Sequence, residues 1–360
     1  MKIKELQKYM KSNKIDVAVL LSLHSMSYDS NVYYFTNYEG QGVLIIPKSS
    51  RPILMVPEME LERARKVSRI KNVFAFDRKA KMFLHLREIL KKRKIKSGAV
   101  GIDYSSATVE QYRALRKGLK ASKTRDIGNA LKCIRGVKTT AEIKILGKGF
   151  GIADAIVRSA IRNFRKFKTE EEAANYMKCE AIKRNCGLSF PPIIASGKNA
   201  SMPHYKPRSV PIQKGFCIID FGVCYKGYCT DITRMVYVGK PTEKEVGLYN
   251  FLLRAQENAI RNVKSGIKGA KLYKNAVKDL RHYAKFFTHG LGHGVGIDIH
   301  EFPSLSPKSK DKIEKNMVFT IEPGLYLTGK FGMRIEDTIL FNGKKAEILT
   351  KVPKRLVVVK

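Results

Sequence analysis

Acidic residues are scarce in this sequence, which holds 32 Asp and Glu against 69 Lys and Arg and carries a net charge of +37. Such a charge favours nucleic acid, anionic lipid or acidic peptides as partners. The basic residues, however, are scattered along the chain, and the cluster at 91–94 falls at the end of a predicted helix, where cations suit the helix dipole. We therefore attribute the charge to a lysine-rich composition of the lineage and do not expect nucleic-acid binding.

Long apolar runs are also lacking. No stretch reaches the roughly 18 apolar residues that a transmembrane helix needs. The first 16 residues have the pattern of an amphipathic helix and lack the apolar core and cleavage site of a signal peptide. The first 128 residues contain no glycine-rich phosphate loop, so nothing supports a nucleotide site there. We expect a cytoplasmic protein with no membrane association.

The six cysteines include no CxxC pair, which argues against a zinc knuckle. Cys224 and Cys229 become cross-strand neighbours if Lys226 and Gly227 form a two-residue turn. A disulfide between them is an alternative that the cytosol of a hyperthermophile permits. We expect reduced thiols that pack as small hydrophobic side chains.

At 360 residues the chain is long enough for two domains. Residues 1–128 alternate predicted strands and helices, which is typical of a separate α/β domain, and residues 129–360 form the second domain. We place the boundary between 125 and 136. The predicted strands of the first domain are 17–21, 43–46, 53–56, 73–76, 100–102 and 124–127, and its predicted helices lie near 59–67, 81–91 and 108–118.

An internal repeat is indicated in the second domain. Three stretches have the form of a capping box, in which Thr is followed three positions later by Glu: Thr139–Glu142, Thr169–Glu172 and Thr242–Glu245. The first and the third begin predicted helices that are each followed by a second helix and then by a hairpin. This spacing, roughly 100 residues, predicts an α+β domain with pseudo-twofold symmetry.

The stretch 218–234, IIDFGVCYKGYCTDITR, predicts a β-hairpin with its turn at Lys226 and Gly227, because Gly tolerates the positive φ of such a turn. In this register Asp220 lies diagonally across from Asp231 on one face, and a turn one residue earlier would place them directly opposite. Two carboxylates held together beside apolar residues repel each other unless a cation lies between them. A divalent metal ion suits that place, and two solvated carboxylates at a hairpin edge are the alternative.

A second hairpin is predicted from strands at 318–324 and 332–340. The first strand carries Glu322 among apolar neighbours, and the second carries Arg334, Glu336 and Thr338 on one face. The two hairpins thus offer four carboxylates, whose formal charge two divalent cations would cancel. Such a cancellation makes a buried two-metal cluster electrostatically tolerable.

Between the hairpins lies a glycine-rich stretch at 288–303, THGLGHGVGIDIHEFP, with histidines at His289, His293 and His300. Dense glycines let the backbone approach a bound object closely. Four carboxylates with one of these imidazoles would form an oxygen-rich site, which favours Mn²⁺ or Co²⁺ over a thiolate-type zinc site. For His289, packing or support of a ligand is as good an interpretation as a direct role.

These motifs resemble those of the pita-bread metallopeptidases, the family of prolidase, aminopeptidase P and methionine aminopeptidase. The resemblance covers nearly the whole chain, and the long region before the catalytic part places it with the Xaa-Pro-cleaving branch. It implies two divalent metal ions: Asp220 chelates one, Asp231 and Glu336 bridge both, and His293 and Glu322 complete the other site.

The resemblance also assigns residues to the reaction. His204 and His300 match the histidines that contact substrate near the scissile bond, where they would stabilise the tetrahedral intermediate and the departing proline nitrogen. Glu322 is a candidate proton shuttle, and Arg334 a candidate substrate-binding residue. A water between two metal ions has its pKa lowered and would attack the peptide carbonyl as hydroxide.

One departure from the family pattern bears on substrate. Many dipeptidases of the family carry Arg directly after the HExP segment, where it clamps the substrate carboxylate, and here Ser304 stands at that position. We therefore predict an Xaa-Pro aminopeptidase, with an Xaa-Pro dipeptidase (prolidase) as the alternative. A protein- or nucleic-acid-binding module on the same fold is a further alternative.

The resemblance implies a homodimer that acts on proline-containing peptides. The segment 31–40, NVYYFTNYEG, resembles a loop of the Xaa-Pro branch, and its aromatic residues could reach the active site of a neighbouring subunit. Local packing of these aromatic side chains is the alternative interpretation.

Overall fold

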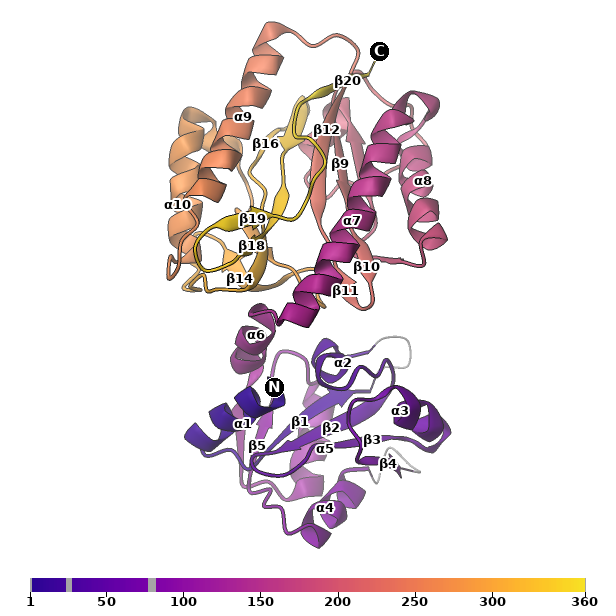
Figure 1. The fold of residues 1–360 in the computed structure, drawn as a ribbon, viewed down its shortest axis with the longest axis vertical. Coiled ribbons are helices and arrows are strands. Elements are labelled where there is room, and N and C mark those ends of the chain that lie inside the picture. The colour runs from indigo at the N-terminus through magenta and orange to yellow at the C-terminus, as the bar shows by residue number, and fades with distance from the viewer. Residues whose placement is uncertain (1, 24–27, 77–81, 360) are drawn as a thin grey trace. The chain divides into compact units, whose positions relative to one another are not determined.

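The structure is a computed structural model that describes residues 2–23, 28–76 and 82–359 (Figure 1). It divides into two compact units, Met1–Arg135 and Gly136–Lys360. Helix α6 (Gly128–Gly136) therefore belongs to the first unit except for its last residue. No helix among the described residues is long and apolar enough to cross a membrane.

The first unit is an α/β domain built on a six-stranded sheet with the order β4-β3-β2-β1-β5-β6. The β1–β2 and β2–β3 pairs are antiparallel, and the other neighbours are parallel. Strands β1 and β2 are buried at every position, which is why they read as continuous apolar runs. The strands are β1 (Val17–Ser22), β2 (Gly42–Pro47), β3 (Ile53–Pro57), β4 (Val73–Phe76), β5 (Ala99–Ile102) and β6 (Lys123–Asp126).

The six predicted strands of this unit are confirmed, with shifts of one residue at some ends. The predicted helices also form, although position 81 of the second lies outside the described residues. The helices that accompany the sheet are α1 (Lys2–Ser12), α3 (Leu61–Val67), α4 (Met82–Lys92) and α5 (Val109–Leu119).

The segment 31–40 differs from the expected loop. Its first six residues belong to helix α2 (Ser30–Thr36), which Asp29 caps by accepting a hydrogen bond from the backbone N–H of Val32. The helix ends at Asn37, which adopts the left-handed conformation with φ of 62°. Tyr33, Tyr34, Phe35 and Tyr38 are all buried. These aromatic side chains therefore pack locally within the first unit, which is the alternative interpretation given above.

The second unit consists of two halves of the same plan. Each half begins with two helices and continues into an antiparallel hairpin, as the repeat predicted. Figure 1 shows α7 and α8 on one flank of the strands of this unit and α9 and α10 on the opposite flank. The four helices are α7 (Thr140–Arg162), α8 (Glu170–Lys183), α9 (Glu243–Arg261) and α10 (Gly269–Leu280).

Two of the three predicted capping boxes form in full, at Thr139 with Glu142 and at Thr242 with Glu245. The remaining one, at Thr169 and Glu172, forms only in part. The Thr169 hydroxyl accepts a hydrogen bond from the backbone N–H of Glu172, but the Glu172 carboxylate accepts from the backbone N–H of Lys168 and not from that of Thr169. The N-termini of these three helices are therefore fixed by local side-chain hydrogen bonds.

Four sheets make up the strands of the second unit, with orders β11-β10-β7, β20-β12-β9-β8, β14-β13-β15-β18-β19 and β16-β17. The strands of the first half are β7 (Gly187–Leu188), β8 (Ile193–Ser196), β9 (Gly215–Phe221), β10 (Val223–Tyr225), β11 (Tyr228–Cys229) and β12 (Ile232–Val238). Those of the second half are β13 (Gly292–Gly294), β14 (Glu301–Leu305), β15 (Met317–Ile321), β16 (Gly324–Leu327), β17 (Phe331–Arg334), β18 (Asp337–Phe341), β19 (Ala346–Ile348) and β20 (Val357–Val359).

Strand β9 separates two hydrophobic cores. Cys217 and Ile219 pack into the core under α7 and α8, whereas Phe216 and Ile218 pack into the core of the second half. Because side chains alternate along a strand, the residue after Ile219 points toward the second half. That residue is Asp220, so the fold aims its carboxylate at the junction of the two halves.

All six cysteines lie among the described residues, and none forms a disulfide. Cys224 lies directly opposite Cys229 in the β10–β11 pair, as the predicted register requires.

Candidate metal centre

The first hairpin has the predicted register. Tyr225 pairs with Tyr228 across a turn in which Lys226 and Gly227 have φ of 50° and 75°, as a two-residue turn of type I′ requires. The same register continues into β9 and β12, where Asp220 pairs with Thr233. Asp231, two residues before Thr233, is thus the diagonal neighbour of Asp220 on the face that points toward the second half.

The second hairpin is interrupted where the sequence predicted two continuous strands. β15 pairs with β18 and β16 with β17, but residues 322–323 and 335–336 lie outside the strands. The interruption has a physical cause, because the backbone N–H of Glu336 donates to the Thr233 carbonyl of the first hairpin at 3.3 Å. The register is the same on both sides of the gap, which places Glu322 opposite Glu336.

Thr233 connects the two hairpins. Its hydroxyl donates to Glu336 Oε2 at 2.7 Å and accepts from Arg334 Nε at 3.1 Å. The Thr338 hydroxyl donates to the Asp231 carbonyl at 2.8 Å. Arg334, Glu336 and Thr338 therefore all reach the first hairpin, as their predicted common face requires, even though the strand that carries them is broken.

His293 lies on β13, beside β15. Its Nε2 is 3.3 Å from Glu322 Oε1 and 3.5 Å from Asp231 Oδ2, and its Nδ1 is 3.1 Å from the Gly294 carbonyl. With a metal ion bound, a proton on Nδ1 donated to this carbonyl would leave the Nε2 lone pair for the ion, which is the arrangement of a metal-binding imidazole. Without one, burial opposes protonation of His293, but the hydrogen bond to Glu322 outweighs it and raises the pKa of His293.

One ligand atom each from Asp231, His293 and Glu336 lies within 4.8 Å of the others. The remaining two predicted ligands adjoin this group: Asp220 pairs with Arg334 Nη2 at 2.5 Å, and Glu322 lies against His293. Two carboxylate oxygens of this cluster, Asp220 Oδ1 and Glu336 Oε1, are buried without a hydrogen-bond partner. Buried carboxylate oxygens of this kind need a positive charge, so the donor set fits divalent metal ions.

The electrostatics of the cluster support this fit. Burial, together with the nearby carboxylates, raises the pKa of Asp231 and of Glu336 well above the ordinary values. Burial and Glu322 likewise raise the pKa of Asp220, against the opposing charge of Arg334. Burial also opposes ionisation of Glu322, but the hydrogen bond and charge of His293 outweigh it and lower the pKa of Glu322 to about 2. Without cations, three of the four carboxylates are thus held in unfavourable surroundings.

The cluster lines a cavity of about 810 Å³ within the second unit. The structure brings every predicted site residue to this one cavity: Asp220, Asp231, His293, Glu322, Glu336, His204, His300 and Arg334. Ser304, which lies opposite His293 in the β13–β14 pair, also lines it. Phe190, Pro191, Pro192 and Ile299 contribute apolar surface.

The histidines outside the proposed ligand set occupy distinct positions. His300 packs edge-on against His293 with 4.2 Å between ring centroids, and burial, with the charge of His293, lowers its pKa. His204 lies exposed on the cavity wall. His289 also lines the cavity, its Nε2 is 3.0 Å from the Tyr326 hydroxyl, and burial lowers its pKa.

Two residues of the site were missed in the sequence. Tyr326 receives a hydrogen bond from Arg334 Nη1 at 2.8 Å and joins Arg334 to His289. Nothing local in the sequence marks Tyr326, because its partners come from other elements. Thr233 could have been found, since it follows Asp231 by two positions and therefore shares its face.

Known proteins resemble this chain along its whole length. The profile of "Metallopeptidase family M24" matches residues 145–342, and that of "Creatinase/Prolidase N-terminal domain" matches residues 2–137. A curated relative named Xaa-Pro dipeptidase, from Pyrococcus furiosus, is 35% identical over 99% of each chain.

Solved structures give the same result. The prolidase from Pyrococcus horikoshii OT3 superposes with a TM-score of 0.88 at 32% identity, covering 99% of each chain. The X-Pro aminopeptidase from Thermotoga maritima MSB8 superposes with a TM-score of 0.87 at 29% identity, covering 96% of this chain and 98% of that one. The similarity therefore includes both units, and with the second unit the segments that form the cavity.

Proposed function

Because the chain belongs to metallopeptidase family M24 and has its pita-bread fold, we propose that it is an Xaa-Pro dipeptidase that depends on two divalent metal ions. The observation that carries the proposal is the convergence of four carboxylates and one imidazole on a cavity, with two buried oxygens that lack partners. The proposed ligands are Asp220, Asp231, His293, Glu322 and Glu336, with Mn²⁺ or Co²⁺ as the ions that suit this set.

The sequence favoured an aminopeptidase because Ser304 replaces the carboxylate-clamping Arg. The relatives favour the alternative instead, since the named Pyrococcus relatives are dipeptidases or prolidases. The cavity can offer a positive charge to the substrate carboxylate without an Arg at position 304, because Lys178 and Lys206 line it. An aminopeptidase is the second candidate, supported by the Thermotoga maritima structure and by Ser304.

The chain's own residues have separate parts in the proposed reaction. When bound, the metal ions would lower the pKa of a water molecule and polarise the scissile carbonyl. Glu322, which is ionised at neutral pH, would accept a proton at its carboxylate and deliver it to the departing proline nitrogen. His300 would be neutral at that pH and would donate its ring N–H to the developing oxyanion, together with His204.

Removal of divalent ions is expected to abolish hydrolysis, and Mn²⁺ or Co²⁺ to restore it, because the carboxylate cluster requires cations. The same ions are expected to stabilise the fold, by about 2.7 kcal/mol for each site at a concentration of 100 times its Kd. Activity of the chelated protein and its melting temperature with and without Mn²⁺ measure both effects. Full activity after exhaustive chelation would contradict the metal-dependent mechanism.

A dipeptidase is expected to hydrolyse Xaa-Pro faster than Xaa-Pro-Yaa. A charge-assisted hydrogen bond to the substrate carboxylate contributes about 1.5–3 kcal/mol, which corresponds to a preference of roughly 10–100-fold in kcat/KM. The matched control is Xaa-Pro amide, which has the length of the dipeptide without its charge and should be the poorer substrate. Equal or faster cleavage of the tripeptide would favour the aminopeptidase.

A further inference from the structure

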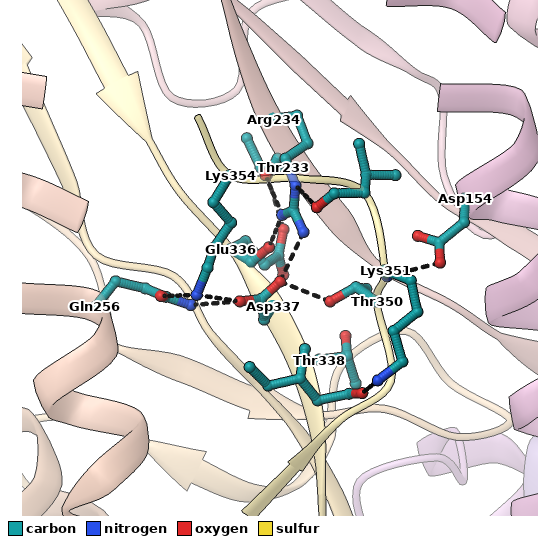
Figure 2. Close-up of polar contacts among 12 residues, drawn as sticks. Asp154, Thr233, Arg234, Gln256, Glu336, Asp337, Thr338, Thr350, Lys351 and Lys354 are labelled. Carbon is teal, nitrogen blue, oxygen red and sulfur yellow. Dashed lines mark hydrogen bonds and ion pairs between the residues drawn. The ribbon is translucent and has the colours of Figure 1, made fainter. Parts of the chain in front are cut away.

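A buried polar network adjoins Thr233 and Glu336 of the proposed metal centre (Figure 2). Its centre is the ion pair between Arg234 Nη2 and Asp337 Oδ1, at 2.7 Å, in which Arg234 is 2% exposed and Asp337 is fully buried. Both residues are chain neighbours of groups at the centre, since Arg234 follows Thr233 and Asp337 follows Glu336. The network therefore joins the two hairpins at positions next in the chain to Thr233 and Glu336.

The guanidinium of Arg234 binds more than its partner carboxylate. Its Nη1 donates to the backbone carbonyls of Thr233, at 2.9 Å, and of Glu336. Its Nε donates to the Val352 carbonyl at 2.9 Å. Figure 2 shows the guanidinium lying between these carbonyls and the Asp337 carboxylate. One rigid planar group thus holds backbone segments from both hairpins at fixed separations.

The Asp337 carboxylate has a second set of donors. Thr350 Oγ1 donates to Oδ1 at 2.7 Å, while Lys354 Nζ and Gln256 Nε2 donate to Oδ2 at 2.9 and 3.0 Å. Lys354 and Arg234 therefore neutralise the same carboxylate from opposite sides. Among the described contacts, Arg234 and not Lys354 binds the backbone of Thr233 and Glu336.

The contact of Arg234 with the Thr233 and Glu336 carbonyls affects the direction of the Glu336 side chain. Glu336 Oε2 accepts from the Thr233 hydroxyl, and Oε1 is buried without a partner. The direction of Oε1 depends on the spacing of the Thr233 and Glu336 backbones. This spacing is fixed by the hydrogen bond from Glu336 N–H to the Thr233 carbonyl and by the two that Arg234 Nη1 donates to the carbonyls of Thr233 and Glu336.

We propose that Arg234 is a positioning residue of the metal centre: by holding the carbonyls of Thr233 and Glu336 together, its guanidinium aims Glu336 Oε1 at the metal ions. The inference rests on the proposed function, in which Glu336 is a ligand. Lys354 stabilises the same network without a part in aiming the ligand.

The test uses the full-length protein and its affinity for Mn²⁺ alone, measured from the electron paramagnetic resonance signal of free Mn²⁺. Arg234→Lys keeps the positive charge beside Asp337 but loses the planar fork that reaches several acceptors at once. We expect its Kd for Mn²⁺ to rise by about 10–100-fold, as is typical when groups that orient a metal ligand are lost. Because Kd is measured without substrate, a change in catalysis alone would not produce this result.

Lys354→Met is the matched control, since it disturbs the same carboxylate of Asp337 by removing a cation that does not contact the backbone of Thr233 or Glu336. It is expected to lower the melting temperature without a measurable change in Kd for Mn²⁺. Asp337→Asn removes the anchor of the guanidinium and serves as the second variant if Arg234→Lys does not fold. It too is expected to weaken Mn²⁺ binding.

Wild-type affinity in a folded Arg234→Lys or Asp337→Asn variant would overturn the positioning role and leave the proposed function intact. An equal loss of affinity in Lys354→Met would also overturn it, because the effect would then follow any disturbance of the network around Asp337 rather than the contact of Arg234 with the Thr233 and Glu336 carbonyls. Absence of saturable Mn²⁺ binding by the wild-type protein would instead refute the proposed function itself.

Discussion

Asp231→Asn is expected to abolish peptide hydrolysis while leaving the fold intact. Asp231 lies in the group of three ligand atoms, and the substitution removes one negative charge with almost no change of shape. Loss of groups that only orient a ligand typically costs about 10–100-fold, so loss of a ligand should lower kcat/KM by more than about 100-fold. The measurement is kcat/KM over a range of Mn²⁺ concentrations.

Asp231→Asn is also expected to stabilise the metal-free protein, although it abolishes activity. In the metal-free protein Asp231 is buried beside Glu336, Asp220 and Glu322, whose charges repel it. Removal of its charge should therefore raise the melting temperature of the metal-free protein. Asp279→Asn, on α10 and away from the cavity lining, is the control that should change neither quantity. Activity near that of the wild type with added Mn²⁺ would refute the assignment of Asp231.

Gly222→Ala is expected to be strongly destabilising. Gly222 lies between β9 and β10, and a Cβ placed there would be 1.9 Å from the carbonyl oxygen of Thr230, which lies between β11 and β12 on the other side of the hairpin. A backbone atom cannot rotate away, so the hairpin that carries Asp220 and Asp231 would have to open. We expect a loss of about 3 kcal/mol or more, which for a unit of this size lowers the melting temperature by roughly 6–12 °C.

Gly151→Ala provides the matched control for the glycine prediction. Gly151 lies inside helix α7, where a Cβ would meet nothing within 4 Å. Alanine loses less conformational entropy than glycine on folding, so this change should stabilise the protein by about 0.4–1 kcal/mol. Thermal unfolding of both variants measures the contrast. A Gly222→Ala protein as stable as the wild type would show that the hairpin tolerates a wider separation than the structure gives it.

The local part of the site could be predicted from the sequence. The turn at Lys226 and Gly227 fixes the register of the first hairpin, and the period of two then places Asp220 and Asp231 on one face. The capping residues Thr139 and Thr242 likewise mark where each half begins. These features depend on neighbours a few positions apart, which is the range over which sequence patterns determine geometry.

Features that depend on distant segments could not be predicted in this way. The break before Glu336 arises because its N–H donates to Thr233, about a hundred residues earlier in the chain. The ion pair of Arg234 with Asp337 spans a similar separation, and neither residue carries a local signal of burial. The aminopeptidase hypothesis rested on Ser304 alone, although substrate preference depends on the charge of the whole cavity wall.

The helix at Ser30–Thr36 was missed for a related reason. Its sequence, SNVYYFT, is rich in residues with strand propensity, and the Asp29 cap together with burial of its aromatic side chains overrides that propensity. Tertiary packing, rather than the local pattern, decides the conformation of such a short segment.

The division of the carboxylates between two hairpins constrains how the protein matures. Asp220 and Asp231 are synthesised about a hundred residues before Glu336, and neither half alone supplies more than two carboxylates. A nascent chain therefore has no complete centre until the second hairpin has left the ribosome and docked on the first. Under the proposed function, metal binding and hydrolytic activity would therefore arise together, only after both hairpins have folded, and an incomplete chain would have no active protease site.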